Sequence, residues 1–284
     1  MYPWTQYKGG VFPSTPPIKT KGAAKHFEDI RNFKSRDTDV LLCSQMRTGT
    51  HWLHENISML LCQTTNYNSM GPWWEMNLEY LRQPEEVDQI TGPRILATHI
   101  PFCMLPKQHI DNGYKIVYLR RNPKDRFVSL KCFHDGKKGY PNWTWPEFFE
   151  EFIMEDNFYS GWFNYTKQMA TAVSNKAANI FSVSYEDLII EPKKNITDLA
   201  NFLEVPYTNH FIDDIVEKCK FDNLKNNKLD ASVIVTEDKV TTTFRKGKIG
   251  DWKNWFTVAQ NERFDVKYKQ EMEGVSQDFI FEYP

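Results

Sequence analysis

Short apolar runs alternate with amphipathic stretches along this chain. The run "DVLLCSQ" (39–45) is apolar up to a polar corner and has the length of a buried strand. The apolar residues that follow it recur at helical spacing, at Leu53, Ile57, Leu60 and Leu61. The segment therefore predicts a strand, a loop and a helix in succession.

The same order returns further along the chain. "YKIVYLRR" (114–121) is a strand pattern that ends in two arginines, and "NPKDRFVSLKCF" (122–133) opens a helix with Asn122 as its cap. "PRILATHIP" (93–101) and "NIFSVSYEDL" (179–188) are two more strands that end at polar residues. Helical patterns fill the gaps, notably "WPEFFEEFIM", "NITDLANFLEV" and "NHFIDDIVEKC".

Short strands that alternate with helices predict an α/β fold, here a single domain over residues 1–284 with a central parallel sheet flanked by helices. The Pro- and Gly-rich residues 1–22 are expected to form an extended N-terminal arm, followed by a short helix in "AAKHFEDIRNF". Ligands of such sheets bind at the carboxyl ends of the strands. Polar residues at strand ends are therefore the candidates for a functional site.

Composition narrows the function classes. The formal net charge of −2 and the pI near 6.4 argue against nonspecific binding to nucleic acid. Five cysteines without a C-x-x-C pair fit reduced thiols better than a disulfide framework or a zinc site. The N-terminus lacks a signal-peptide pattern, and no run approaches the roughly 20 apolar residues that a membrane span needs. We therefore expect a cytoplasmic protein that binds neither nucleic acid nor membranes.

Polar and charged side chains crowd the first strand end, "SQMRTGTHW" (44–52). Backbone N–H groups and the dipole at a helix N-terminus suit a phosphate or sulfate, and Gly49 lets the backbone approach it closely. Further donors come from the side chains of Arg47, Thr48, Thr50 and His51. The alternative interpretation is a helix cap beside a surface arginine. The G-x-x-x-x-G-K-[ST] spacing of a nucleotide kinase is absent.

Two basic stretches form a second candidate anion site. Arg120 and Arg121 end a strand, and Ser129 follows two turns into the next helix. The stretch "FRKGKIGDWKNWF" adds Arg245, Lys246 and Gly247. Arginines at strand ends are more often solvated or ion-paired, and an ordinary charged loop is the simpler interpretation of the second stretch.

His99 follows a strand in an otherwise apolar region. A lone histidine in such a place is more often a satisfied core group than a base. It becomes a candidate base if it faces the same cavity as the first strand end.

Four motifs, in the same order, resemble those of the cytosolic sulfotransferases, which transfer a sulfuryl group from 3′-phosphoadenosine 5′-phosphosulfate (PAPS) to a hydroxyl or amine. The family's Y-P-K-S-G-T-T-W appears as "CSQMRTGTHW", its K-T-H-L-P as "ATHIP", its R-N-P-K-D with a following V-S as "RNPKDRFVS", and its R-K-G-x-x-G-D-W-K as "RKGKIGDWK". The resemblance implies PAPS as donor, 3′-phosphoadenosine 5′-phosphate (PAP) as product, and no metal.

The resemblance also implies a role for each motif residue. The 5′-phosphosulfate would be cradled by Thr48, Gly49, Thr50 and His51, with Arg47 beside it and Trp52 stacked on adenine. The 3′-phosphate would be gripped by Arg121, Ser129, Arg245, Lys246 and Gly247. Contacts to adenine and ribose would come from Tyr185, Cys219, Phe221 and Phe244.

The implied mechanism is in-line transfer with His99 as general base. Arg47 and loop N–H groups would meet the charge that develops on the bridging oxygen. Three residues depart from the family: Arg47 replaces its catalytic lysine, Ala97 replaces a second lysine, and His51 replaces a threonine. A guanidinium is bulkier than an ammonium and cannot donate a proton as an acid. The alternative function is therefore a catalytically weakened protein of the same fold that binds PAPS or PAP.

The resemblance places a small, largely apolar or aromatic acceptor against Phe12, Trp73, Phe102 and Phe133. Each of these aromatics could equally be a core residue. The stretch "KNWFTVAQNE" (253–262) fits the family's K-x-x-x-T-V-x-x-x-E dimer segment and implies a homodimer. The competing interpretation of that stretch is a loop and a helix start capped by Thr257.

Overall fold

A four-stranded parallel sheet forms the centre of the protein. The computed structural model describes residues 4–67, 77–82, 84–135, 140–227, 244–275 and 277–282. Across the sheet the order is β4 (Ile95–Thr98), β3 (Val40–Ser44), β5 (Lys115–Arg120) and β6 (Ile180–Ser184). Each strand lies within an apolar run that predicted it, and the α/β class with a central parallel sheet is confirmed.

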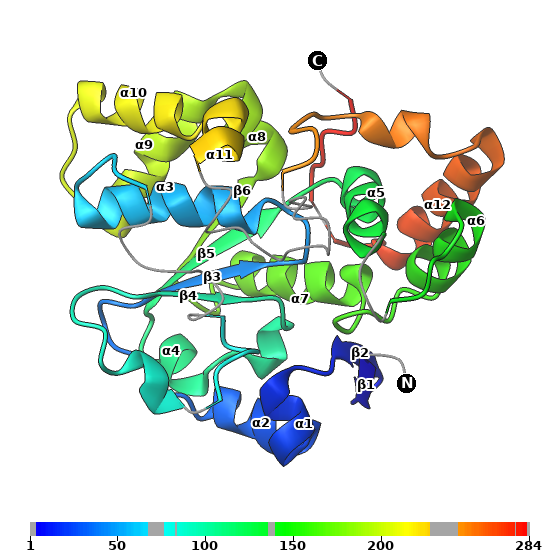
Figure 1. Ribbon diagram of the computed structural model, residues 1–284, viewed down its shortest axis with the longest axis horizontal. Helices are drawn as coiled ribbons and strands as arrows, with labels where there is room; N and C mark the ends of the chain where they lie inside the picture. The colour runs from blue at the N-terminus through cyan, green and yellow to red at the C-terminus, as the bar shows by residue number, and fades with distance from the viewer. Residues whose placement is uncertain are drawn as a thin grey trace.

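The sheet is covered on both faces because successive side chains of a strand point to opposite sides. Leu41 and Cys43 of β3 enter one hydrophobic cluster, and Leu42 enters the other. On the face of Leu42 lie α3 (Thr50–Cys62), α8 (Tyr185–Ile190), α9 (Pro192–Leu203), α10 (Asn209–Lys218) and α11 (Phe221–Asn227) (Figure 1). The expected strand, loop and helix at the first corner are thus β3, residues 45–49 and α3.

The helices of the first cluster lie below the sheet and at one end of it (Figure 1). They are α1 (Pro16–Lys21), α2 (Ala23–Arg31), α4 (Lys107–Asp111), α5 (Pro123–His134), α6 (Trp145–Phe148), α7 (Trp162–Ser174) and α12 (Val258–Glu271). A π-helical stretch, η4 (Phe149–Met154), extends α6. Short 3₁₀ turns are η2 (Pro84–Val87), η3 (Phe102–Met104) and η5 (Asp251–Asn254).

The N-terminal segment differs from the extended arm that its Pro and Gly content suggests. Residues 4–13 form a β-hairpin of β1 (Trp4–Tyr7) and β2 (Gly10–Pro13), and α1 follows. Both turn residues, Lys8 and Gly9, have positive φ (46° and 77°), which is the backbone of a tight two-residue hairpin turn. The hairpin is held to the body by Val11, whose N–H donates to the carbonyl of Asn157 at 2.9 Å.

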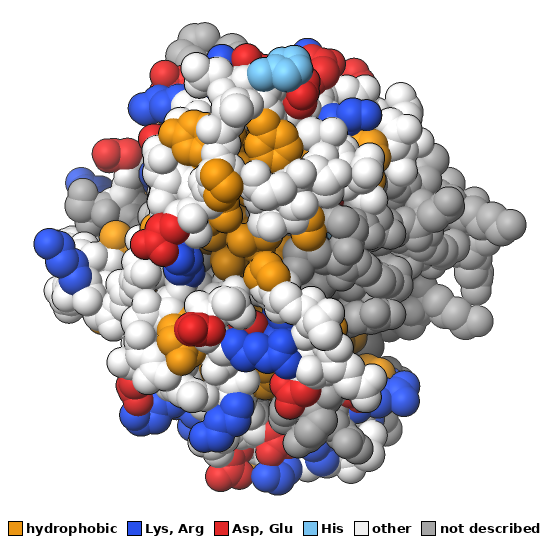
Figure 2. Space-filling view, turned by 90° about the vertical axis from the view of Figure 1, so that its left-hand side faces the viewer, with side chains coloured by type: hydrophobic (Ala, Val, Ile, Leu, Met, Phe, Trp, Pro, Cys, Tyr) orange, Lys and Arg blue, Asp and Glu red, His pale blue; other side chains and the backbone are white. Residues whose placement is uncertain are grey.

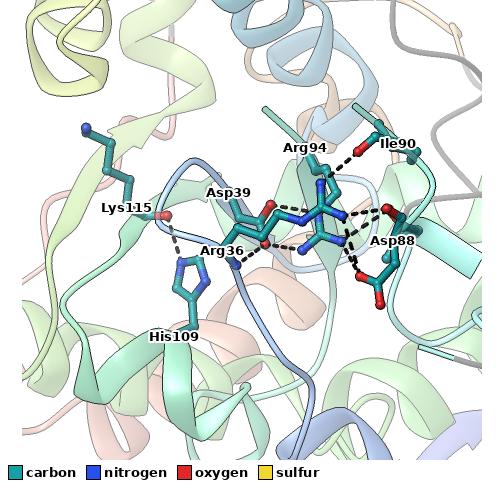
Figure 3. A network of polar contacts seen from close by, with 8 residues as sticks. Arg36, Asp39, Asp88, Ile90, Arg94, His109 and Lys115 are labelled. Carbon is teal, nitrogen blue, oxygen red and sulfur yellow. Dashed lines mark hydrogen bonds and ion pairs between the residues drawn. The ribbon is translucent and has the colours of Figure 1, made fainter. Parts of the chain in front are cut away.

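A closed ion-pair network lies at the amino ends of β3 and β4 (Figure 3). The Arg94 guanidinium, with no exposed side-chain surface, donates to both carboxylate oxygens of Asp39 at 2.7 and 2.6 Å and to Asp88 at 3.0 Å. Arg36 donates its backbone N–H to Asp39 at 2.8 Å. Arg36, Arg94, Asp39 and Asp88 are thus linked in one network of opposite charges.

The surface carries both signs of charge. Figure 2 shows Lys and Arg interspersed with Asp and Glu around a band of hydrophobic side chains, on the side where α3, α9 and α10 lie.

All five cysteines are free thiols, of which Cys43 and Cys219 are buried. Within the described residues, we find no helix with the length and hydropathy needed to cross a membrane.

Candidate active site

The loop between β3 and α3 is held open by its own side chains. Gly49 (φ 108°) precedes α3, and a Cβ at this position would lie 2.8 Å from the Tyr185 ring, so only glycine fits. The hydroxyl of Thr48 donates to the Gln45 carbonyl at 2.6 Å, and the Thr50 and Ser44 hydroxyls bond to each other at 2.6 Å. Both threonine hydroxyls therefore shape the loop, and the first-turn N–H groups of α3 have no acceptor within the helix.

Arg47 turns back toward α5 from this loop. Its backbone is left-handed (φ 69°), its Nε donates to the Ser129 hydroxyl at 3.2 Å, and its guanidinium lies 4.6 Å from the centre of the Phe133 ring. Burial and repulsion from Arg121 and Arg245 lower the pKa of Arg47 to about 9. A cation whose charge is opposed in this way is stabilised by any anion that enters.

Arg121, at the end of β5, contacts the β3–α3 loop that carries Arg47. Its Nη1 donates to the Arg47 carbonyl at 2.9 Å, and its guanidinium lies 4.1 Å from the centre of the Tyr185 ring. Its Nε is buried and has no hydrogen-bond acceptor among the residues that the structure describes. Because a buried cationic N–H without an acceptor costs free energy, this position suits an anionic oxygen. The two cationic corners lie side by side at the carboxyl ends of β3 and β5, as the sequence predicted.

Arg120, the other arginine of the strand end, points elsewhere. It donates to the carbonyl of Asp278 and lies 3.8 Å from the carboxylate of Asp187. Only Arg121 of the pair therefore belongs to the site.

The loop with Arg245, Lys246 and Gly247 is tied to the start of α5. Asp125 accepts hydrogen bonds from the backbone N–H groups of Gly250 at 2.7 Å and Trp252 at 2.9 Å. Gly247 (φ 66°) lies so close to Phe221 that a Cβ would come within 2.4 Å of the ring. The helix cap itself is as predicted, since the Asn122 side chain accepts from the Asp125 N–H.

Sequence reasoning missed Asp125 and Lys124, although both stand inside the quoted "RNPKD" motif. The Lys124 ammonium reaches Asp265 at 2.5 Å and lies 4.5 Å from the centre of the Trp252 ring. Both residues hold the C-terminal segment against α5. The signal that could have found them was a buried Lys-Asp pair directly after a helix cap.

The residues expected around adenine and ribose share the second hydrophobic cluster. The rings of Trp52 and Tyr185 meet edge to face, with centroids 5.3 Å apart, and Phe221 and Phe244 do the same at 6.2 Å. The Cys219 thiol is buried and lies 3.9 Å from the sulfur of Met59. The indole N–H of Trp52 is buried without an acceptor, which suits a polar ligand beside the ring.

His99 lies at the end of β4, against the end of β3. Its Nδ1 is 2.7 Å from the Ser44 carbonyl, which can only accept, so Nδ1 carries the proton and Nε2 is the basic nitrogen. Burial and the charges of Arg126 and Arg47 lower the pKa of His99 to about 4. The imidazole is therefore neutral at physiological pH.

Two further residues that the sequence did not single out hold His99. The Glu79 carboxylate accepts the His99 backbone N–H at 2.6 Å, and burial raises the pKa of Glu79 to about 7. The ring of Tyr159 meets the imidazole edge to face at 5.6 Å. Tyr159 has a left-handed backbone (φ 53°) and donates its N–H to Val11 of the hairpin at 2.8 Å.

The structure describes three of the four residues expected around the acceptor. Phe12, on β2, is buried 4.7 Å from Phe27 and 5.6 Å from Tyr159, ring to ring, and Phe102 packs on the same cluster. Phe133 instead lies under Arg47. Trp73 lies outside the described residues. In the described part of the chain, no three or more His, Cys, Asp or Glu side chains gather in a way that could hold a metal ion.

This arrangement defines a class of site: two adjoining cationic corners for a ligand with separated anionic groups, beside a neutral histidine. A family model described as "Sulfotransferase domain" matches residues 37–276, and the chain belongs to the sulfotransferase family.

Curated relatives agree over nearly the whole chain. Sulfotransferase 1B1 of dog (Canis lupus familiaris) is 33% identical over 271 residues, and Sulfotransferase 1C2 of rat (Rattus norvegicus) is 34% identical over 274 residues, each covering 90% of both chains. Among solved structures, mouse sulfotransferase SULT7A1 complexed with PAP matches with a TM-score of 0.79 and 26% identity over 95% of both chains. The family predicted from the four motifs is confirmed.

Proposed function

We propose that this protein transfers the sulfuryl group of PAPS to a hydroxyl or amine of a small, largely apolar or aromatic acceptor, with His99 as general base. PAPS as donor and PAP as product follow from the family. The acceptor class and the roles of individual residues are the proposal.

The observation that carries the proposal is the convergence of three strand ends. His99 of the β4 end contacts Ser44 of β3, and Arg121 of the β5 end contacts Arg47 of the β3 loop. A base and two anion-binding corners therefore adjoin one loop. The unsatisfied Nε of Arg121 and the indole N–H of Trp52 are the buried donors that a phosphorylated adenosine would use.

In the proposed reaction, the acceptor's hydroxyl gives its proton to Nε2 of His99 as its oxygen attacks sulfur. The new O–S bond forms while the bond from sulfur to the bridging oxygen breaks, and that bond's electron pair stays on the 5′-phosphate of PAP. Arg47 and the N–H groups at the start of α3 stabilise this charge. The Ser44 carbonyl holds the imidazole in the tautomer that the step requires.

The alternative is a protein of the same fold that binds PAPS or PAP with little catalysis. It is supported by Arg47, which is engaged with Ser129 and Phe133, and by Ala97 in place of a second family lysine. We favour transfer because His99 is present together with both candidate anion sites, beside the same loop.

A donor-transfer assay beside a binding assay tests the proposal. Radiolabelled PAPS is incubated with a panel of phenols and steroids, and PAP binding is measured by calorimetry. His99→Ala should lower turnover by about 10²-fold or more, as expected on loss of a general base, with PAP affinity unchanged. Because the pKa of His99 is about 4, kcat/KM should also stay level from pH 8 down to pH 5.5.

Three results decide between the alternatives. Tight PAP binding without product on any acceptor would favour the binding protein. Near-normal turnover of the His99→Ala variant would make the base assignment wrong, and a fall of kcat/KM centred near pH 6.5 would show that His99 is not held neutral.

We further propose a cytoplasmic homodimer that forms through residues 253–262. The segment begins α12 with a capping box at Thr257, and Val258 beside it is 77% exposed, as an apolar contact residue would be in one isolated chain. Light scattering at micromolar concentration should give about twice the 33.6 kDa of one chain. A Val258→Glu variant should give the monomer mass.

A further inference from the structure

Two cations of the second anion site already share one carboxylate. Asp251 lies 2.6 Å from Nη2 of Arg245 through one oxygen and 2.6 Å from Nζ of Lys246 through the other. The Asp251 side chain is only 6% exposed, whereas Arg245 and Lys246 are more open to solvent. The three side chains form a compact cluster at the start of η5.

We propose that Asp251 is a built-in competitor of the nucleotide: its carboxylate occupies the Arg245–Lys246 pair in the nucleotide-free protein and opposes the 3′-phosphate, which weakens nucleotide binding and speeds product release. The inference rests on the proposed function, in which these two cations bind the 3′-phosphate.

Arg121, the third cation of the proposed 3′-phosphate site, differs from Arg245 and Lys246 in its charged neighbours. Among the described residues, no carboxylate forms an ion pair with Arg121, and its Nε has no acceptor. An incoming phosphate therefore meets one cation that no described carboxylate bonds directly, although Glu186 acts on it electrostatically, and two cations that must exchange a carboxylate for the ligand. The pKa of Asp251 is lowered to about 2 by Lys246, Arg245 and Asn254 against the opposing effect of burial, so the competing charge is present throughout the physiological range.

The backbone around Asp251 is held by contacts other than its own carboxylate. Asp125 binds the backbone on both sides of Asp251, and the Trp252 indole donates to the Phe281 carbonyl at 2.8 Å. Asn254 donates to Oδ1 of Asp251 at 3.0 Å, a bond that an asparagine at this position could still accept. Removing the charge should therefore leave the loop folded and the two cations available.

The test is calorimetric titration of the Asp251→Asn variant with PAP and, separately, with adenosine 5′-phosphate, which lacks the 3′-phosphate. We expect the Kd for PAP to fall by about five- to tenfold, the effect of removing one like charge close to a bound anion at a partly solvated site. The Kd for adenosine 5′-phosphate should change by less than about twofold, and PAP should dissociate more slowly in stopped flow.

A matched control removes an equal charge from a neighbouring ion pair. Glu282 pairs with Lys253 at 2.8 Å and is 62% exposed, so Glu282→Gln should leave PAP affinity unchanged. An unchanged or higher Kd for PAP in Asp251→Asn would overturn the inference. So would an equal gain for both nucleotides, because the effect would then not concern the 3′-phosphate.

Folding of the variants is itself a test. Asp251→Ser is made beside Asp251→Asn, and both should melt cooperatively within a few degrees of the wild type. Loss of the folded state in both would overturn the inference, because the carboxylate would then be a structural support of the loop. If the wild-type protein fails to bind PAP, the proposed function falls and this inference with it; if it binds and the variants bind no better, only the inference fails.

Discussion

The two ends of the central sheet hold their arginines in opposite ways. At the amino ends of β3 and β4, Arg94 is fully buried and bound to both oxygens of Asp39 (Figure 3). At the carboxyl ends, Arg121 and Arg126 are 8% and 1% exposed and donate to neutral oxygens: Arg121 to the Arg47 carbonyl, and Arg126 to the Met46 carbonyl and the Gln45 side chain. Arg94 is thus neutralised by a direct ion pair within the protein, whereas Arg121 and Arg126 have no direct carboxylate partner among the described residues.

Because of this difference, the residues that stabilise the fold and the residues that bind the ligand lie at opposite ends of the sheet. A buried ion pair that loses one partner leaves an uncompensated charge, so the amino end is expected to govern folding. Burying a positive charge among neutral groups costs free energy, and a bound anion offsets this cost. The carboxyl end is therefore expected to govern affinity.

The largest effect on stability should come from the closed end. Arg94→Met leaves the Asp39 carboxylate buried without its partner and should lower the free energy of unfolding by about 3–5 kcal/mol. Urea denaturation measures this loss, and PAP affinity at low temperature should stay within about twofold of the wild type. The Arg94→Met/Asp39→Leu double variant should recover much of the stability, since no charge is then stranded. A loss below about 1 kcal/mol in the single variant would mean that the network contributes little.

Much of this contrast could be predicted from the sequence. Apolar runs with polar ends placed all four strands, and parallel strands bring their carboxyl ends to one edge, so Arg47 and Arg121 were expected near one another. Whether His99 faces them was left open by the sequence. The amino-end network could not be predicted in this way. Asp39 and Arg94 are 55 residues apart, and their pairing depends on β3 and β4 being neighbours in the sheet.

The remaining differences also come from contacts distant in sequence. The turn of the N-terminal hairpin lies at Lys8–Gly9, and the segment that the hairpin meets is at Asn157–Tyr159. Asp125 and Asp251 are ordinary acidic residues in the sequence, and their partners lie across the fold or within a loop without periodicity. Local pattern therefore predicted the elements, whereas the positioning residues required the assembled structure.

At the open end, the adjacent arginines provide a matched pair. Arg121→Met should weaken PAP binding by about 10- to 100-fold, as expected on loss of hydrogen bonds to a charged group, with little change in thermal stability. Arg120→Met should stay within about twofold, because Arg120 is turned toward Asp278 and Asp187. Calorimetric titration with PAP measures both. A larger effect for Arg120 than for Arg121 would contradict the assignment of the open corner.

The smallest expected effect concerns the family departure at Arg47. Its guanidinium is held between the Ser129 hydroxyl and the Phe133 ring, so part of its hydrogen-bonding capacity is already used within the protein. A lysine is a compact charge on a flexible stem and can turn toward an oxygen that gains charge only in the transition state. Arg47→Lys should therefore raise kcat by about three- to tenfold, a change in barrier of about 1 kcal/mol, with little change in PAP affinity.

A variant without charge at position 47 tests whether the charge itself stabilises the transition state. Arg47→Met removes the charge, which the arginine still carries at pH 7.5 because its pKa is about 9, and should lower kcat below the wild type. The order of turnover is then lysine, arginine, methionine, measured with saturating PAPS and one acceptor. If lysine proves slower than arginine, the guanidinium is the better stabiliser in this site, and the departure from the family improves the open end for catalysis rather than weakening it.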